Sequence, residues 1–333
     1  MRGIRIAEEY IQKLNLDLSG LEILTEAGSG HYIYSPLIAA LSGARRVLAI
    51  APDSGWATHA ETVKRLEAYK KYIGFKANCI EIVKDRKAAA GGKFDIFLNL
   101  GFVRPIDETL LFFASEKAVV AYMCEKWEWR EGDVDLDACR RRSIPVVGIN
   151  ENFGEFYVFE ACGQLLLKML FDAGQEVANC KYIVVGDDRF GKLACNSLRA
   201  NNAACVLLHI AKDISIDDLR TCEAIITADY VRGDEVLAGI VWSPQQIKTI
   251  NPYLEIIQFA GHIDVGAYIE AGICVHPPTA LPPQRMAQTL SYLGPRSVIG
   301  LHCLGIKAAE VVYRKITMNK FDLRFSDLIQ PIL

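Results

Sequence analysis

The stretch KYIVVGDDRFGKLACNSLRANNAACVLLH, residues 181–209, is the most informative part of this chain. It begins with a short apolar run, 182–185, which is typical of a buried strand, and continues into a helix pattern that ends near Asn202. A second apolar run, 204–208, completes a strand–turn–helix–strand unit. Such units assemble into a parallel sheet with helices on its faces.

The turn inside this stretch is similar to the dinucleotide fingerprint G-x-G-x-x-G without its middle glycine. Gly186 and Gly191 stand where the first and third glycines of the pattern belong. The first makes a tight turn, and the third allows close packing of helix on strand. The second lets the backbone approach a pyrophosphate, and here Asp188 takes its place.

The helix that begins near Gly191 offers unpaired N–H groups and the positive end of its dipole to an anion. We therefore predict NAD or NADP as the cofactor. Its predicted binding residues are Gly186, Asp188, Arg189, Phe190, Gly191 and His209. His209 replaces the acid that usually binds the ribose about 20 residues after the turn, and Lys212 nearby leaves NADP open.

Asp188 is the residue that opposes this prediction. Two like charges ~4 Å apart at an effective dielectric constant of ~20 repel each other by about 4 kcal/mol, which would offset much of a pyrophosphate's binding energy. A structural turn that binds no cofactor is therefore the alternative.

The composition bounds the class of protein. The chain has 333 residues, of which 51% are hydrophobic and 23% are charged, so about two globular domains are expected. A net charge of −3 gives no reason to expect a nucleic-acid partner. Residues 1–9 lack the apolar core of a signal peptide, and no apolar run reaches ~18 residues, so we predict a cytoplasmic protein with no membrane partner.

The ten cysteines are spread singly, without a C-x-x-C pair. Several lie in apolar runs, among them Cys162, Cys195 and Cys205, where a reduced thiol behaves as a small hydrophobic residue. We therefore expect reduced cysteines and no metal site.

Apolar strands alternate with amphipathic helices along the whole chain, which is typical of an α/β protein. We predict two Rossmann-like doubly wound parallel-sheet domains, joined by a long helix at 153–173 and with a cleft between them. The predicted boundaries are 1–150 for a Rossmann/flavodoxin-like substrate domain, 151–283 for a dinucleotide-binding-type domain, and 284–333 for a helical return that packs on the first domain. In the first domain, strands are expected at 22–26, 46–51, 77–83, 94–98, 118–123 and 145–147.

Three segments resemble the D-2-hydroxyacid dehydrogenases and their relative S-adenosylhomocysteine hydrolase. Residues 132–170 are similar to a segment that leads through a loop into a long helix, and Arg189-Phe190-Gly191 fits the end of the G-x-G-R-I-G turn. Phe259-Ala260-Gly261-His262-Ile263-Asp264 resembles the G-H-F-D segment of the hydrolase. The resemblance implies two Rossmann-like domains with a ligand cleft, and NAD in the second domain.

The chain also departs from these families. Ala260 stands where the dehydrogenases carry a catalytic arginine, and their late Glu and Pro-His pair has no counterpart. Residues 150–155, Asn-Glu-Asn-Phe-Gly-Glu, lack the Lys and Asp of the hydrolase. The resemblance therefore implies a divergent member.

We predict His262, Asp264 and Lys126 as the catalytic residues. His262 and Asp264 follow an apolar strand, and ligands of open α/β sheets bind at the carboxyl ends of strands. Histidine is the usual proton-transfer group near pH 7. Lys126 follows another strand and suits a substrate carboxylate. The alternatives are that His262 serves the turn and that Lys126 is a solvated loop residue.

A second turn resembles the first motif of class I methyltransferases, which implies S-adenosylmethionine as an alternative cofactor. It lies between an expected strand and helix in the first domain, and Asp53 follows the next strand. Its candidate substrate-binding residues are Gly28, Ser29, Gly30, His31 and Asp53. A tight turn that faces the cleft is the simpler explanation.

The leading hypothesis is a divergent NAD(P)-binding oxidoreductase, or a redox-assisted lyase or hydrolase, that acts on a small polar metabolite in the cleft. One alternative is an S-adenosylmethionine-dependent methyltransferase that uses the first domain. Another is a non-catalytic ligand-binding protein with a degenerate cofactor site. The resembled families and the apolar connecting helix indicate a homodimer.

Overall fold

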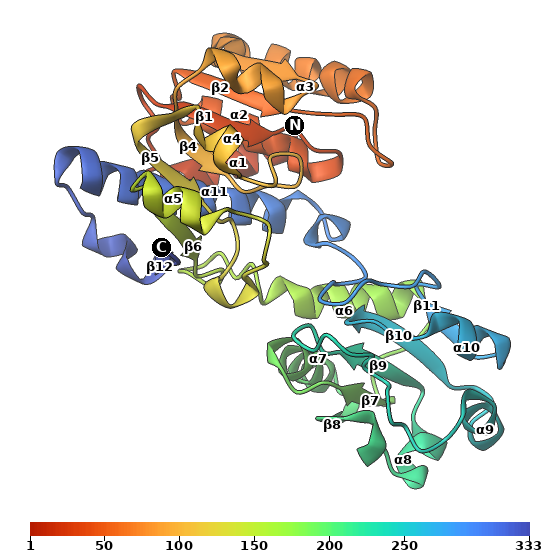
Figure 1. Ribbon diagram of the computed structural model, residues 1–333. Helices are drawn as coiled ribbons and strands as arrows, with labels where there is room; N and C mark the ends of the chain where they lie inside the picture. The colour runs from red at the N-terminus through yellow and green to blue at the C-terminus, as the bar shows by residue number, and fades with distance from the viewer. The chain divides into compact units, whose positions relative to one another are not determined.

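The computed structural model describes residues 1–333 and divides into two compact units. Unit 1 comprises Met1–Val158 and Gly294–Leu333, and unit 2 comprises Phe159–Leu293. Each unit is built around its own sheet of mainly parallel strands (Figure 1). The two parallel-sheet α/β units that the sequence predicts are therefore confirmed.

Unit 1 has a seven-stranded sheet in the order β12-β6-β5-β4-β1-β2-β3. Its strands are β1 (Glu22–Glu26), β2 (Arg46–Ile50), β3 (Ile80–Val83), β4 (Phe94–Leu98), β5 (Ala114–Ala121), β6 (Val146–Ile149) and β12 (Ile329–Pro331). The first six are parallel and follow the Rossmann order 3-2-1-4-5-6, whereas β12 runs antiparallel to β6. The six predicted strands of this unit are confirmed, and only the three-residue β12 is missed.

Helices cover the sheet of unit 1. The α-helices are α1 (Arg2–Leu14), α2 (Tyr34–Leu41), α3 (His59–Ile73), α4 (Glu108–Leu111), α5 (Leu136–Arg141) and α11 (Pro295–Met318). The 3₁₀ helices are η1 (Gly30–Ile33), η2 (Gly74–Cys79), η3 (Arg86–Gly91), η4 (Lys126–Glu128) and η7 (Leu323–Leu328). Helices α1, α2 and α11 pack against one another, whereas α4 and α5 add side chains to a core cluster on the sheet.

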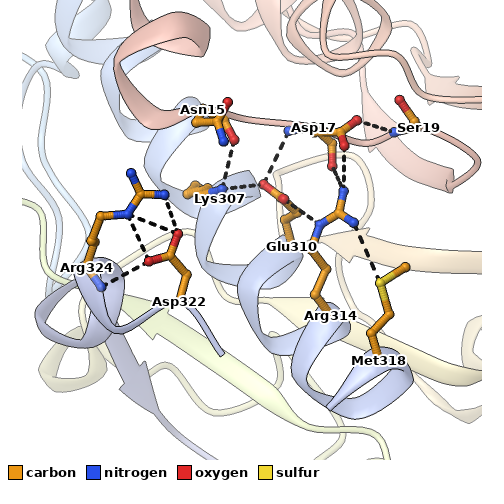
Figure 2. Close-up of polar contacts among 9 residues, drawn as sticks. All are labelled: Asn15, Asp17, Ser19, Lys307, Glu310, Arg314, Met318, Asp322 and Arg324. Atoms are coloured by element: carbon orange, nitrogen blue, oxygen red, sulfur yellow. Dashed lines mark hydrogen bonds and ion pairs between the residues drawn. The ribbon is translucent and has the colours of Figure 1, made fainter. Parts of the chain in front are cut away.

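A network of charges with a buried centre joins α11 to the segment after α1 (Figure 2). Glu310 accepts hydrogen bonds from Lys307 Nζ at 2.8 Å and from Arg314 Nε at 2.7 Å, and Lys307 and Glu310 are each only 3% exposed. Lys307 Nζ also donates to the carbonyl oxygen of Asn15 at 3.0 Å, and Arg314 Nη2 donates to that of Asp17 at 2.7 Å. These contacts fix the C-terminal helix within unit 1.

Unit 2 has a five-stranded parallel sheet in the order β11-β10-β9-β7-β8. Its strands are β7 (Lys181–Val185), β8 (Ala204–Leu208), β9 (Ala224–Ala228), β10 (Glu255–Ala260) and β11 (Cys274–His276). Its helices are α6 (Ala161–Asp172), α7 (Arg189–Ala200), α8 (Ile216–Thr221), α9 (Pro244–Ile250), α10 (Val265–Glu270) and the 3₁₀ helices η5 (Ala211–Asp213) and η6 (Leu290–Tyr292). None of the helices in the chain has both the length and the apolar character needed to cross a membrane.

The predicted long helix at 153–173 is wrong in its first half, because α6 begins only at Ala161. Gly154 and Tyr157 have φ values of +56° and +46°, which lie in the left-handed region and are incompatible with a right-handed helix. The Asn150 side chain also accepts the N–H of Asn152 at 3.0 Å, a turn contact that competes with helix formation.

The expectation that all cysteines are reduced is wrong for one pair. Cys195 on α7 and Cys205 on β8 form a disulfide, with their Cα atoms 5.7 Å apart. The two residues meet because α7 packs directly on the neighbouring strand β8. The other eight cysteines are free thiols.

Candidate functional site

The turn between β7 and α7 has the backbone geometry that requires its two glycines. Gly186 has φ +110°, which glycine adopts without steric cost. A Cβ on Gly186 would lie 2.7 Å from the backbone of Ala228. A Cβ on Gly191 would lie 1.7 Å from the carbonyl oxygen of Gly186, so α7 can approach the strand this closely only with glycine there.

Asp188 closes the N-terminus of α7 with its own carboxylate. Oδ1 accepts the backbone N–H groups of Phe190 at 2.8 Å and Gly191 at 3.1 Å. Oδ2 accepts those of Tyr230 at 2.8 Å and Val231 at 3.3 Å, from the segment after β9. Four N–H groups therefore point at one carboxylate, in the place where a helix N-terminus binds an anion.

This arrangement changes the interpretation of Asp188. The sequence suggests a charge that repels phosphates, whereas in the structure the carboxylate occupies the donors that a phosphate would use. Burial raises the pKa of Asp188 above its ordinary value, and its hydrogen bonds from the N–H groups of Gly191 and Tyr230 act in the opposite direction. An external anion must displace this carboxylate to reach the same donors.

Phe190 and Arg189 belong to an aromatic cluster next to the turn. The Phe190 ring is buried against Phe159, Tyr230 and Phe259, with ring centroids 5.0–5.8 Å apart. The Arg189 guanidinium lies over the Phe159 ring, 4.3 Å from its centroid. Phe190 therefore contributes only its backbone N–H to the turn, as a donor to Asp188, while its side chain packs in the core.

His209 follows β8 and lies beside the turn. Its Nδ1 is 2.7 Å from Asp187 Oδ1, and this hydrogen bond lowers the pKa of Asp187 below its ordinary value. Arg232 Nη2 donates to the carbonyl oxygen of His209 at 2.9 Å, and Arg232 also pairs with Asp229. The position where an acidic ribose partner is expected thus carries a histidine with an arginine beside it.

His262 and Asp264 lie after the carboxyl end of β10, as the sequence predicts. His262 Nδ1 is shielded from solvent and has no hydrogen-bond partner, and its carbonyl oxygen accepts the N–H of Val236 at 2.9 Å. Asp264 is the N-cap of α10, since its Oδ1 accepts the N–H of Ala267 at 3.2 Å. Asp264 therefore has a structural role in addition to any chemical one.

Lys126 belongs to unit 1, whereas His262 and Asp264 belong to unit 2. It begins η4, and its side chain is exposed. Its backbone N–H donates to Gln330 Oε1 at 2.7 Å. The structure therefore places the three predicted catalytic residues in two separately described units.

The second predicted turn, residues 28–31, follows β1, and Asp53 follows β2. Because β1 and β2 are parallel neighbours, both groups lie at the same edge of the sheet of unit 1. Asp53 already has two partners: Lys84 Nζ lies 2.5 Å from Oδ2, and the N–H of His59 donates to Oδ1 at 2.7 Å. The structure thus places these residues at one edge of the sheet, but the Asp53 carboxylate is already bound by Lys84 and by the backbone N–H of His59.

Glu26, the last residue of β1, is a buried acid that sequence reasoning did not single out. It is 5% exposed, and its Oε2 accepts the N–H of Phe102 at 2.8 Å. Two glycines leave space for the carboxylate: a Cβ on Gly28 would lie 3.1 Å from Oε1, and one on Gly101 would lie 3.4 Å from Oε2. Burial raises the pKa of Glu26 to about 7, where a carboxyl group both donates and accepts protons.

Glu26 lies at the point where the strand order of unit 1 reverses, between β1 and β4. Ligands of open α/β sheets bind outside the carboxyl ends of strands at such a point. Asn99 follows β4 and is fully buried; its Nδ2 donates to the carbonyl oxygen of Tyr122 at 3.1 Å, and its Oδ1 accepts Arg104 Nε at 3.1 Å. The charge of Arg104 partly offsets the effect of burial on Glu26.

Two histidines near this turn have shielded ring nitrogens without a hydrogen-bond partner. His302 of α11 is fully buried, neither ring nitrogen has a partner, and burial lowers its pKa to about 4. Its ring lies 5.9 Å from that of Tyr32 in η1. His31 Nδ1 is likewise shielded and unpartnered. Buried polar groups usually have partners, so these groups mark the β1 turn as a second candidate site.

The raised pKa of Glu26 predicts a pH-dependent stability that Glu26→Gln removes. Below pH ~4.5 the Glu26 carboxyl is protonated in both the folded and the unfolded chain, so its burial does not lower the free energy of unfolding. As the pH rises to about 7, the unfolded chain ionises first and the free energy of unfolding falls, by about 3 kcal/mol in all. At pH 8 we therefore expect the free energy of unfolding of Glu26→Gln to be about 3 kcal/mol higher than that of the wild type. Urea unfolding measures both values.

Glu67→Gln is the matched control, because Glu67 lies exposed on α3 and bonds to Lys70 on the same helix. It should keep the pH dependence of the wild type. Equal stabilities of Glu26→Gln and the wild type across pH 5–8 would contradict the assignment of a buried, protonated Glu26.

A comparison with solved structures finds proteins of similar fold. One of the subunits of dipicolinate synthase from Bacillus halodurans is similar over 89% of this chain and 99% of its own, with 12% identity and a TM-score of 0.52. The chain therefore shares the fold of that subunit. At this identity the likeness shows the fold alone. The expected fold class, α/β with two Rossmann-like parallel sheets, is confirmed.

Two further structures resemble the chain more weakly. NAD-dependent formate dehydrogenase from Staphylococcus aureus, in complex with NAD, has 11% identity and a TM-score of 0.46, covering 92% of this chain and 98% of its own. D-lactate dehydrogenase from Aquifex aeolicus, complexed with NAD and lactic acid, has 12% identity and a TM-score of 0.37, covering 78% and 96%. No protein-family model and no curated protein matches the sequence.

Proposed function

We propose that this chain is an oxidoreductase-type protein that binds NAD or NADP in unit 2, at the turn 186–191. The observation that carries the proposal is the set of four N–H groups that point at one carboxylate at the start of α7. The turn is therefore built to hold negative charge, and the glycines on either side of it have the spacing of a dinucleotide fingerprint.

In this proposal Asp188 acts as an internal anion that lowers the affinity for the dinucleotide. The pyrophosphate binds only when the carboxylate leaves its donors, so part of the binding energy offsets the loss of the internal hydrogen bonds. This effect acts in addition to the charge repulsion expected from the sequence.

Replacing Asp188 with glycine tests this function. We expect Asp188→Gly to bind NADH or NADPH at least about tenfold more tightly than the wild type, a difference of ~1.4 kcal/mol. Titration followed by nicotinamide fluorescence measures both dissociation constants. Asp187→Gly is the matched control, because it removes a neighbouring carboxylate that does not contact the α7 donors, and it should change the affinity much less.

The absence of binding by both the wild type and folded Asp188→Gly at millimolar dinucleotide would overturn the proposal. That result would favour the second candidate, a ligand-binding protein with a degenerate cofactor site. One observation already favours this candidate: the carboxylate of Asp188 satisfies the turn without any ligand.

The structure supports the methyltransferase alternative less well. Both carboxylate oxygens of Asp53, the candidate ribose-binding residue, already have partners in Lys84 and the N–H of His59. For the oxidoreductase we propose a small polar metabolite as substrate, with His262 of unit 2 as the candidate for proton transfer. Redox-assisted lyase or hydrolase chemistry, a homodimer and a cytoplasmic location belong to the same proposal.

A further inference from the structure

Three side chains of different chemistry meet at one edge of the sheet in unit 2. Glu255 begins β10, whereas Cys274 begins the edge strand β11 and His276 ends it. Glu255 and Cys274 are directly paired across the two parallel strands. Cys274 and His276 are two residues apart on β11, so their side chains point to the same face of the sheet.

The ligand atoms of these residues lie close enough to share one ion. One carboxylate oxygen of Glu255, Sγ of Cys274 and a ring nitrogen of His276 all lie within 4.8 Å of one another. A tetrahedral zinc ion, with bonds of about 2.0–2.3 Å, keeps its ligands ~3.5 Å apart. Glu255 Oε2 and His276 Nε2 are 3.3 Å apart, so this pair already has the required separation.

The contact between Glu255 and His276 is not a hydrogen bond. His276 Nε2 is shielded from solvent and has no hydrogen-bond partner, although the carboxylate oxygen is close. Both atoms can donate a lone pair to the same point, and a cation there would satisfy both. A buried ring nitrogen without a partner is uncommon in folded proteins, which makes this pair informative.

The surroundings suit a metal site as well. Gln175 Nε2 donates to Glu255 Oε2 at 2.9 Å, and outer hydrogen bonds of this kind orient the carboxylates that bind metals. Cys274 is an exposed free thiol, so an ion can reach it from solvent. The combination of thiolate, imidazole and carboxylate is a donor set that zinc accepts.

We propose that Glu255, Cys274 and His276 bind one zinc-type divalent cation, with a water molecule as the fourth ligand. The sequence alone predicts no metal site, because its cysteines are spread singly and form no C-x-x-C pair. Zinc binds cysteine as the thiolate, so the ion takes the place of the proton on Cys274 Sγ and that proton passes to water.

A second group of potential ligands, Cys124, Glu128 and Glu151, lies in unit 1 and provides a control. Burial raises the pKa of the Cys124 thiol well above its ordinary value, which disfavours the thiolate that a metal needs. Cys124 is also only partly exposed, whereas Cys274 is exposed, so the three residues of unit 2 are the better site.

Cobalt(II) tests the proposal, because it replaces zinc and its bond to a thiolate gives a charge-transfer absorption band. The reduced full-length chain should bind one cobalt ion with this band, and zinc should displace it. Cys274→Ser should abolish the band, His276→Ala should weaken cobalt binding at least about tenfold, and Cys124→Ser should change neither.

The absence of the band in the wild type would overturn the proposal. So would a band that persists in Cys274→Ser, or one that is lost in Cys124→Ser, because either result would place the thiolate ligand elsewhere. Thermal unfolding of each variant without metal confirms that the variants are folded, so a lost band reports a lost ligand.

Discussion

Glu310→Ala is expected to lower the free energy of unfolding by about 3–5 kcal/mol, because it leaves the buried charge of Lys307 without its partner. Glu310 also accepts Arg314 Nε and the backbone N–H of Asp17, so the substitution breaks the link between α11 and the segment after α1 (Figure 2). Urea unfolding followed by circular dichroism measures the loss.

Asp322→Ala is the matched control for this prediction. Asp322 pairs with Arg324 in the same view, but the Arg324 side chain is 70% exposed, and exposed ion pairs contribute little to stability (Figure 2). The double variant Lys307→Met, Glu310→Leu should recover much of the lost stability, since it removes both buried charges. If Glu310→Ala unfolded like Asp322→Ala, the network would not stabilise unit 1.

Gly191→Ala is the second substitution with a large expected effect, at least about 3 kcal/mol. The new Cβ would lie 1.7 Å from the carbonyl oxygen of Gly186. The atoms that it would meet first, the carbonyl oxygen and carbon of Gly186, are backbone atoms, so relief requires α7 to move away from the sheet. Calorimetry should show a lower unfolding temperature, and the change should appear in the transition of unit 2.

Gly266→Ala provides the comparison, because Gly266 lies in the helix α10 and a Cβ there makes only an ordinary contact, 3.4 Å from Asp264 Oδ1. Alanine also has the higher helix propensity, so this variant should change the stability by no more than about 1 kcal/mol. An equally mild effect at Gly191 would show that α7 does not need a glycine for its close approach to the strand.

The sheets were predictable because their strands are apolar runs bounded by turns. Glu22–Glu26 and Phe94–Leu98 begin and end at the predicted residues, and the turn at Gly186 was recognised from glycine spacing alone. A sequence pattern of this kind reports burial and local conformation, and these determine where strands and tight turns form.

Contacts between distant segments were not predictable in the same way. Glu26 is a candidate acid only because Phe102 and Gly101, more than 70 residues later, close around its carboxylate. The one local signal was a carboxylate at the end of an otherwise apolar strand. Asp188 was recognised as the critical residue, but its partners Tyr230 and Val231 come from beyond β9 and cannot be inferred from the turn itself.

The helix start at 153 was mispredicted for a related reason. The apolar spacing of 153–173 favours one long helix, yet the turn at 150–158 forms because two of its residues adopt left-handed backbone conformations. Periodicity describes which face of a helix is buried, and it does not report where side-chain hydrogen bonds stop the helix.

In our proposal, the N-terminus of α7 is an anion site that Asp188 fills. Calorimetric titration with inorganic pyrophosphate tests it most directly, because this probe needs no nicotinamide or ribose contacts. We expect Asp188→Gly, and Asp188→Ser as a capped but uncharged variant, to bind pyrophosphate at least about tenfold more tightly than the wild type. Failure of both folded variants to bind it more tightly than the wild type would contradict the claim.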